Sequence, residues 1–449
     1  MKTVSGFPYF EVQFTKDGAV NDAAEVAALH DFLAQKTASD LLLISHGWNN
    51  DLNDARDLYA RFLASLRAVL DQGVVPGAAG RSFAVLAVLW PSIKFADEQL
   101  IPSGAAALGS AVSIAFVQQQ LDRLEHALQD PAKSPALQRA RALVPALPNS
   151  PKAQEEFANL VRSALPTSDR ETAGDEDASG DFLERSGGDL MDRLSKPITV
   201  PLAAPAGGGA ASTSMRPGGS APGGTGGAVG LGQTFSGVLS GARNLLNYST
   251  YYLMKDRAAA VGRGGVNGVL RKMKAVRPDL RVHLVGHSFG GRLVTALAEG
   301  PAGQAPMTVD TLTLLQAAFS HNGFAAKFDG ARDGAFRAVV TGHRVTGPIV
   351  VTHSRNDRAV GVAYPLASRI AGQDAAALGD ENDRFGGLGR NGAQHTPERV
   401  VGTLQPVGSS YTFEPGKIYN LNADAIIADH SDICHNEVAF ALLKAVVAS

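Results

Sequence analysis

The residues best suited to do chemistry lie around Ser288. The segment GHSFG at 286–290 has the pattern Gly-x-Ser-x-Gly and follows a run of apolar and β-branched residues at 282–285. Apolar residues at helical spacing, such as Leu293 and Leu297, come after it. A strand that turns into a helix at a serine presents the hydroxyl at the tip of a strained turn, between glycines that leave room for neighbouring elements. The segment therefore predicts a nucleophilic serine, and a glycine-rich turn of another α/β fold is the alternative for so short a motif.

A candidate acid lies downstream of the serine. A serine hydroxyl needs a base to remove its proton, and the base needs a carboxylate to orient it. In this arrangement the acid follows the serine along the chain and the histidine comes last. Asp357 stands directly after an apolar run at 349–352, whereas Asp329 and Asp383 follow no predicted strand so closely. We expect Asp357 to be the acid, with a solvated loop aspartate paired with a neighbouring arginine as the alternative.

The candidate base is His430, which lies after the last predicted strand at 417–422 and before a closing helix at 436–447. His435 is the second choice, because it falls at the first turn of that helix. The alternative is that one or both are surface or capping histidines. The neighbouring Asp432 does not indicate a metal site, because the sequence has no His-Glu-x-x-His or comparable cluster. No metal and no cofactor are therefore expected.

Backbone N–H groups that would stabilise an oxyanion are expected at two places. The residue after the nucleophile, Phe289, supplies one in this kind of turn, and the loop after an early strand supplies the other. That early strand is the apolar run at 40–45, which ends in HGWNN at 46–50. Gly47 would let the backbone approach the substrate and Trp48 would donate its N–H, with a simple strand-ending turn as the alternative.

Other aromatic residues and histidines are candidates for supporting roles. Trp90, Phe319 and His321 are the candidates for lining the acyl or alcohol pocket, and membership of the hydrophobic core is an equal alternative for each. His46 is expected to pack and hydrogen-bond locally, and the ring of His287 to brace the turn at the serine.

Apolar runs that alternate with helical patterns surround these residues. Continuous apolar segments such as 40–45 and 82–90 are typical of strands buried on both faces of a parallel sheet. Their alternation with helices predicts an α/β fold with a doubly wound, mostly parallel sheet. The predicted strands are 8–14 at an edge, 40–45, 82–90, 280–285, 309–316, 349–352 and 417–422, and the predicted helices are 23–33, 52–70, an interrupted helix at 244–276, and 436–447. Residues 371–410 are expected to form a loop.

The pattern changes between 93 and 242, so we expect a catalytic domain of 1–92 and 243–449 with 93–242 as an insertion. An uncharged run at 99–121, rich in Ala, Gly and Ser, predicts a buried or lid helix rather than a transmembrane one. Residues 201–241 have too little apolar surface to offset the entropy of ordering them, which predicts a flexible linker. The insertion is therefore expected to be a helical lid or cap joined to a partly disordered linker.

Together, five motifs in this order resemble those of the α/β-hydrolase superfamily, and in particular its bacterial esterase- and lipase-like branch with HG-aromatic-NN in the oxyanion strand. They are HGWNN at 46–50, WPS at 90–92, GHSFG at 286–290, SRND at 354–357 and HSDI at 430–433. The resemblance implies Ser288 as nucleophile, Asp357 as acid, His430 as base, and the N–H groups of Trp48 and Phe289 as oxyanion donors. It covers about 1–92 and 243–449, and the long segment between them departs from it.

Composition sets limits on partners and location. Lysine and arginine total 41 and acidic residues 43, a net charge of −2, which gives no indication of nucleic-acid binding. Cys434 is the only cysteine, so no internal disulfide can form, as is usual in a reducing compartment. The N-terminus lacks the apolar core of a signal peptide. We therefore expect a cytoplasmic protein, or one exported without such a signal.

These observations predict a serine hydrolase that cleaves carboxylic esters by acyl transfer to Ser288. Its expected substrate is a small-molecule or lipid ester. A lipase or phospholipase is the first alternative, in which residues 100–118 would contact a lipid interface. The second is a non-catalytic interaction module with a hydrolase fold, whose working surface would be the insertion.

Overall fold

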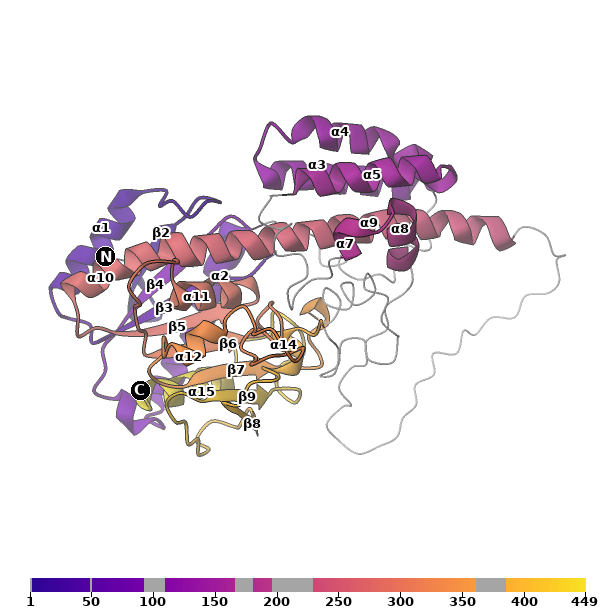
Figure 1. Cartoon of the computed structure of the whole chain (residues 1–449). Coiled ribbons are helices and arrows are strands. Elements are labelled where there is room, and N and C mark those ends of the chain that lie inside the picture. Colours follow the sequence, from indigo (N-terminus) through magenta and orange to yellow (C-terminus); the bar gives the residue numbers. More distant parts are fainter. Residues whose placement is uncertain (1, 49–50, 93–109, 166–180, 196–228, 361–384) are drawn as a thin grey trace, which may run out of the picture.

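A single sheet of nine strands forms the centre of the molecule (Figure 1). The computed structural model of the chain describes residues 2–48, 51–92, 110–165, 181–195, 229–360 and 385–449. The strands are β1 (Thr3–Val4), β2 (Phe7–Gln13), β3 (Asp40–Ser45), β4 (Phe83–Leu89), β5 (Arg281–His287), β6 (Thr311–Leu315), β7 (Ile349–His353), β8 (Arg399–Thr403) and β9 (Ile418–Asn422). They lie in the order β1-β2-β4-β3-β5-β6-β7-β9-β8. Only β1 and β2 pair antiparallel, which confirms the predicted α/β class with a mostly parallel sheet.

Helices cover both faces of this sheet. Side chains of β3 alternate between two hydrophobic clusters, with Leu41 and Leu43 in one and Leu42 and Ile44 in the other. The first cluster includes side chains of α1 (Ala23–Ala34), α9 (Val229–Ala260), α10 (Asn267–Val276), α11 (Phe289–Glu299) and α12 (Arg337–Thr341). The second includes side chains of α2 (Leu52–Asp71) and α15 (Asn436–Val447). Burial on both faces explains the continuous apolar runs of the central strands, and the doubly wound arrangement is confirmed.

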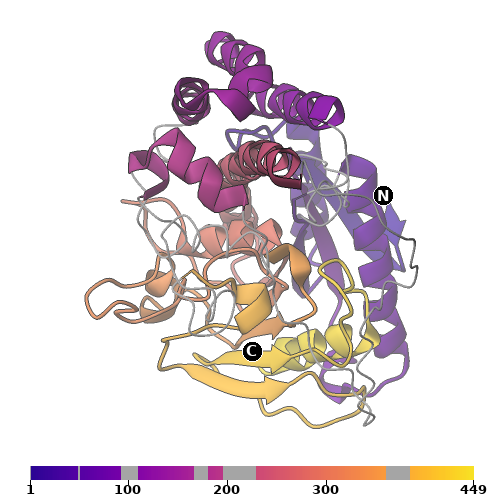
Figure 2. The ribbon, with the colours of Figure 1, turned by 90° about the vertical axis from the view of Figure 1, so that its right-hand side faces the viewer.

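The described part of the insertion is helical and packs on α9. It comprises α3 (Ser110–Leu128), α4 (Ser134–Leu143), the 3₁₀ helix η4 (Val144–Asn149), α5 (Pro151–Ala164), α7 (Asp181–Glu184) and α8 (Gly187–Ser195). In both Figure 1 and Figure 2 the purple helices α3, α4 and α5 lie on the side of α9 away from the sheet. Helix α8 lies so close to α9 that a Cβ on Gly241 would stand 2.1 Å from the carbonyl oxygen of Met191. These helices, called the cap below, therefore form a layer on the side of α9 away from the sheet.

The beginning of α9 corrects one prediction. The flexible linker was expected to extend to residue 241, but residues 237–241 belong to α9 and pack against α8. Residues 201–228 of that predicted linker lie outside the described residues, as does the part of the uncharged run from 99 to 109. The rest of that run belongs to α3. The interrupted helix predicted at 244–276 is confirmed, because a π-helical turn at Val261–Val266 separates α9 from α10.

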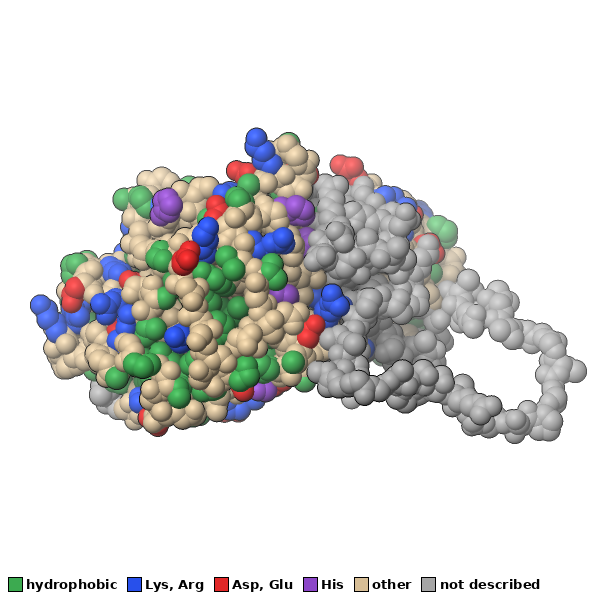
Figure 3. Space-filling model, turned by 90° about the horizontal axis from the view of Figure 1, so that it is seen from below, with side chains coloured by type: hydrophobic (Ala, Val, Ile, Leu, Met, Phe, Trp, Pro, Cys, Tyr) green, Lys and Arg blue, Asp and Glu red, His purple; other side chains and the backbone are tan. Residues whose placement is uncertain are grey.

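The two edges of the sheet also differ from prediction. The run at 8–14, expected at an edge, is β2, and the two-residue β1 pairs along its outer side. Strand β8 lies within 371–410, where a loop was expected. Figure 3, which views the molecule from the side of β8 and β9, shows hydrophobic side chains among polar ones over this part. In β8, Val400 and Val401 are exposed, so this edge strand has no buried apolar pattern to reveal it.

Among the residues that the structure describes, no helix is both long and apolar enough to span a bilayer.

A buried polar network joins the amino-terminal ends of the central strands. Asp40 at the start of β3 is fully buried and accepts hydrogen bonds from Nε2 of His283 at 2.9 Å and Nη1 of Arg81 at 2.7 Å. The other ring nitrogen of His283 lies 2.9 Å from the hydroxyl oxygen of Thr311 in β6. Burial works to raise the pKa of Asp40, but hydrogen bonds from His283 and Ser39 outweigh it and hold the pKa below its usual range. The network therefore stabilises the folded state when Asp40 is ionised.

We expect Asp40→Asn to lower the free energy of unfolding by about 3 kcal/mol at neutral pH, because it breaks a buried ion pair and leaves the Arg81 charge without its partner. The pKa of Asp40 is depressed in the folded state, so this advantage of the wild type exists above the unfolded pKa of about 3.9 and disappears as the pH falls through the folded pKa. Urea unfolding at neutral pH and at about pH 3 measures both effects. The control is Asp71→Asn, whose carboxylate is mostly exposed 3.5 Å from Arg67, and which should change stability by less than about 0.5 kcal/mol.

Candidate functional site

The candidate site lies where the order of strands changes direction. Strand β4 lies on one side of β3 and β5 lies on its other side. In open α/β sheets, a crevice forms outside the carboxyl ends of the strands at such a point. Gly47 lies two residues after the end of β3, and Ser288 directly follows the end of the neighbouring strand β5. The topology therefore brings the predicted oxyanion loop to the predicted nucleophile.

Ser288 occupies a strained turn between β5 and α11. Its φ of 57° and ψ of −126° are an uncommon conformation for a residue with a side chain, and such strain is found at functional turns. The end of β6 holds this turn in place on both sides of the residue. The N–H of Ser288 donates to the carbonyl of Leu315 at 3.1 Å, and its carbonyl accepts from the N–H of Ala318 at 2.9 Å.

Two glycines allow the backbone to pack closely around Ser288. A Cβ on Gly47 would stand 2.3 Å from the Cβ of Ser288, so the loop after β3 lies directly against the serine. A Cβ on Gly290, in the first turn of α11, would stand 2.2 Å from the carbonyl oxygen of Ser45. Both distances are far shorter than any non-bonded contact, so neither position accommodates a side chain without moving the backbone.

His46 fixes the loop after β3. Its Nδ1–H donates to the carbonyl of Gly47 at 2.9 Å, and its Nε2 accepts from the N–H of Trp90 at 3.3 Å. The indole of Trp90 stacks on the imidazole and donates to the His46 carbonyl at 3.0 Å. The hydroxyl of Tyr59 accepts the N–H of His46 at 2.7 Å and donates to the carbonyl of Val88 at 2.6 Å. Burial lowers the pKa of His46 to about 4, so its imidazole is neutral near neutral pH. This agrees with the prediction that His46 packs and hydrogen-bonds locally.

Asp357 and His430 form a hydrogen-bonded pair. Oδ2 of Asp357 accepts from Nδ1 of His430 at 2.9 Å, and Oδ1 accepts the N–H of Val360 at 2.9 Å. The carboxylate is fully buried, whereas the imidazole is partly exposed. The amide of Asn356 donates to the carbonyl of Ile427 at 2.9 Å, which ties the loop after β7 to the loop that carries His430. The carboxylate therefore fixes both the orientation and the tautomer of the imidazole.

His287, the residue before the serine, contacts the loop of His430. Its Nε2–H donates to the backbone carbonyl of His430 at 2.8 Å, and the two ring centroids are 4.9 Å apart. Ser288 is therefore joined to the Asp357–His430 pair through its immediate neighbour in the chain. The structure thus places the predicted acid and base in direct contact, and the predicted nucleophile next in the chain to a residue that bonds the backbone of the predicted base.

The two predicted oxyanion donors both lie next to the serine. Phe289 is the first residue of α11, so its N–H has no acceptor within the helix. Trp48 belongs to the loop that Gly47 brings against Ser288, and its ring packs edge-on against the ring of Phe289 with centroids 5.8 Å apart. This arrangement is compatible with two backbone donors converging beside Ser288.

The predicted substrate-lining residues are all buried. Trp90 stacks on His46, and Phe319 packs edge-on against Phe324 with centroids 5.8 Å apart. His321 is fully buried, with its Nδ1 3.2 Å from the amide nitrogen of Asn391. These surroundings agree with the alternative that all three are core residues. A contact with substrate stays a prediction for each.

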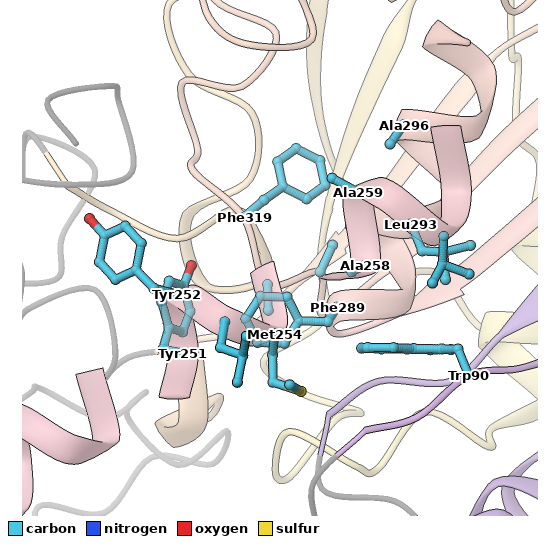
Figure 4. Close-up of a cluster of buried hydrophobic side chains, with 14 of the residues drawn as sticks. Trp90, Tyr251, Tyr252, Met254, Ala258, Ala259, Phe289, Leu293, Ala296 and Phe319 are labelled. Carbon is cyan, nitrogen blue, oxygen red and sulfur yellow. The ribbon is translucent and has the colours of Figure 1, made fainter. Parts of the chain in front are cut away.

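Residues of α9 were not anticipated near the site. Figure 4 shows Tyr251 and Met254 beside Phe289, in a cluster that also includes Trp90 and Phe319. The ring centroids of Tyr251 and Phe289 are 5.0 Å apart. The signal in the sequence was a group of tyrosines just after the glycine-rich stretch, but only the path of α9 across α11 shows which of them meets the turn.

The competing candidates for acid and base lie elsewhere. Asp329 accepts hydrogen bonds from Arg332 within its own loop, and Asp383 lies outside the described residues. His435 occupies the N-cap position of α15, and its Nε2 lies 2.8 Å from Oδ1 of Asp432. Its contact is therefore with Asp432 rather than with Asp357.

We expect Gly290→Ala to destabilise the fold by about 1–3 kcal/mol or more, because its Cβ would overlap the backbone oxygen of Ser45. The matched control is Gly268→Ala in α10, where a Cβ meets nothing within 4 Å. Alanine is the better helix former, so this control should gain about 0.5–1 kcal/mol. Urea unfolding of both variants measures the difference, and equal stabilities would contradict the close approach of α11 to the loop after β3.

The chain was also compared with known proteins. No family model, no curated protein and no solved structure matches it. What can be inferred about its function therefore rests on the geometry of this site.

Proposed function

We propose that this chain is a serine hydrolase that cleaves carboxylic esters, with Ser288 as nucleophile, His430 as base and Asp357 as acid. The observation that carries the proposal is the hydrogen bond between Asp357 and His430, beside a serine in a strained turn at the switch point of the sheet. The order of these residues along the chain agrees with a membership of the α/β-hydrolase superfamily, which we also propose.

In the first half of the proposed reaction, Oγ of Ser288 attacks the ester carbonyl carbon. Nε2 of His430 takes the serine proton, because the hydrogen bond to Asp357 engages Nδ1 of the ring. The buried carboxylate stabilises the imidazolium that forms. The negative charge on the carbonyl oxygen is accepted by the backbone N–H groups of Trp48 and Phe289.

To complete acylation, the tetrahedral intermediate collapses and the bond to the alcohol oxygen breaks. His430 returns its proton to that oxygen, so the alcohol leaves neutral and the acyl group stays on Ser288. A water molecule then gives a proton to His430 and attacks the acyl carbonyl. Collapse of this second intermediate breaks the bond between the acyl carbon and Oγ of Ser288, which takes the proton from His430, and the carboxylic acid leaves.

The lipase alternative receives little support from the described part of the insertion. Residues 100–109 of the predicted interfacial segment lie outside the described residues. Within α3, Val117 is buried in the core and Ile114 packs against it. These side chains are occupied by packing rather than presented to a lipid surface, so a soluble ester is the substrate class that we propose.

Ser288→Ala should abolish the hydrolysis of p-nitrophenyl esters, because it removes the oxygen that forms the acyl-enzyme. A fluorophosphonate probe should label the wild type and not this variant, as intact-protein mass spectrometry would show. Ser163→Ala, which removes an exposed hydroxyl on α5, should keep both activity and labelling. A folded wild type that resists the probe would favour the interaction module over the enzyme.

Asp357→Asn should lower kcat for a short-chain ester by about 10³–10⁴-fold, because the amide no longer holds the Nδ1–H tautomer of His430 or stabilises its charged form. Steady-state kinetics on both proteins give this ratio. Asp329→Asn tests the competing candidate and should leave kcat unchanged. A larger loss at position 329 than at position 357 would mean that the acid is wrongly assigned.

A further inference from the structure

We infer that His287 is a positioning residue that holds the base His430 in place beside the nucleophile. The inference rests on the proposed function, because it concerns the geometry of the same reaction. His287 would act through the backbone of His430 and would not touch the substrate.

The contact between the two histidines is direct and buried. His287 is the last residue of β5 and is 4% exposed. Its Nε2–H donates to the His430 carbonyl at 2.8 Å, and the rings lie 4.9 Å apart at an angle of 41°. One end of this link is thus covalently next to Ser288, and the other is the backbone of the base.

The chemistry of His287 suits a fixed donor. Because a carbonyl only accepts, Nε2 must carry the ring proton. The opposite nitrogen, Nδ1, is buried with no hydrogen-bond partner among the described residues. Burial, with a smaller contribution from His430, lowers the pKa of His287 to about 3. The ring therefore stays neutral in the working range of a hydrolase and does not compete with His430 for the serine proton.

The base needs such an anchor because of where it lies. His430 belongs to the connection between β9 and α15, which contains no helix or strand in the described structure. Hydrogen bonds from Asn356 and Ser354 to the carbonyl of Ile427 tie this connection to the loop after β7. They fix the base relative to the acid, whereas the bond from His287 fixes it relative to the nucleophile. A displacement of about 1 Å between reacting groups can cost about 100-fold in rate.

A purely structural role for His287 is the alternative, and the same strand provides the comparison. His283 lies four residues earlier in β5, is fully buried and bonds to Asp40 and Thr311. It belongs to the network at the opposite end of the strands. Substitution of His283 therefore reports the cost of losing a buried histidine of β5 without disturbing the base.

The test compares His287→Met with His287→Gln. Methionine fills a similar volume but offers no donor, whereas the glutamine amide places an N–H near the position of Nε2. We expect His287→Met to lower kcat for a p-nitrophenyl ester by about 10–100-fold with little change in KM, and His287→Gln to restore most of the loss. His283→Gln should lower the melting temperature and leave kcat unchanged.

A second measurement does not depend on turnover. The proton on Nδ1 of His430, bonded to the Asp357 carboxylate, should give a downfield ¹H NMR resonance in the wild type. We expect it to persist in His287→Gln and His283→Gln and to be lost or broadened in His287→Met. If the wild type hydrolyses no ester and resists a fluorophosphonate, the proposed function fails, while this resonance still decides whether His287 positions His430.

Several results would overturn the inference. One is a His287→Met protein with wild-type kcat and an unchanged resonance. Another is a His287→Gln protein as impaired as His287→Met, because the donor would then not be what matters. Failure of both variants to fold, with His283→Gln folded, would assign His287 a structural role.

Discussion

The site depends on the close approach of two backbone turns, one after β3 and one after β5. Parallel pairing aligns the ends of these strands, with Ser45 opposite Gly286. Beyond that point there is no room for a Cβ on Gly47 or Gly290, so both positions must be glycine for the turns to pack this closely. This contact places the backbone of Gly47, in the first turn, directly against the serine of the second.

Four histidines lie around this contact: His46 and His287 are buried, and His353 and His430 are partly buried. Burial lowers the pKa of His46 and His353 to about 4 and that of His287 to about 3, so all three are neutral near neutral pH. Each lies within hydrogen-bonding distance of a backbone carbonyl: Gly47, Arg390 and His430, respectively. His430 alone among these four bonds to a carboxylate. The environment thus separates the three histidines that contact backbone carbonyls from the one for which we propose the role of base.

The sequence could predict what depends on local pattern. The central strands are apolar on both faces, so continuous apolar runs in the sequence predicted them. The order of serine, aspartate and histidine along the chain then indicated the candidate site. Strand β8 was not predicted because its valine side chains are exposed and the strand is held by pairing with β9. The helix at 237–241 was not predicted because glycine and serine favour a linker, whereas in the structure Gly241 packs closely against Met191 of α8. The link from His287 to His430 joins residues 143 positions apart and becomes visible only in space.

Side chains of α9 contact both the cap and the residues around the site. Arg257 on this helix donates Nη1 to the carbonyl of Pro91, just beyond β4, and Nη2 to the carbonyl of Ala127 at the end of α3. Burial lowers the pKa of Arg257 to about 10, so it remains charged at neutral pH. A buried cation that loses its acceptors is costly, so α3 cannot move away from the sheet without a large penalty. Because Tyr251 of the same helix packs on Phe289, the helix that carries the cap also contacts the residue that follows Ser288.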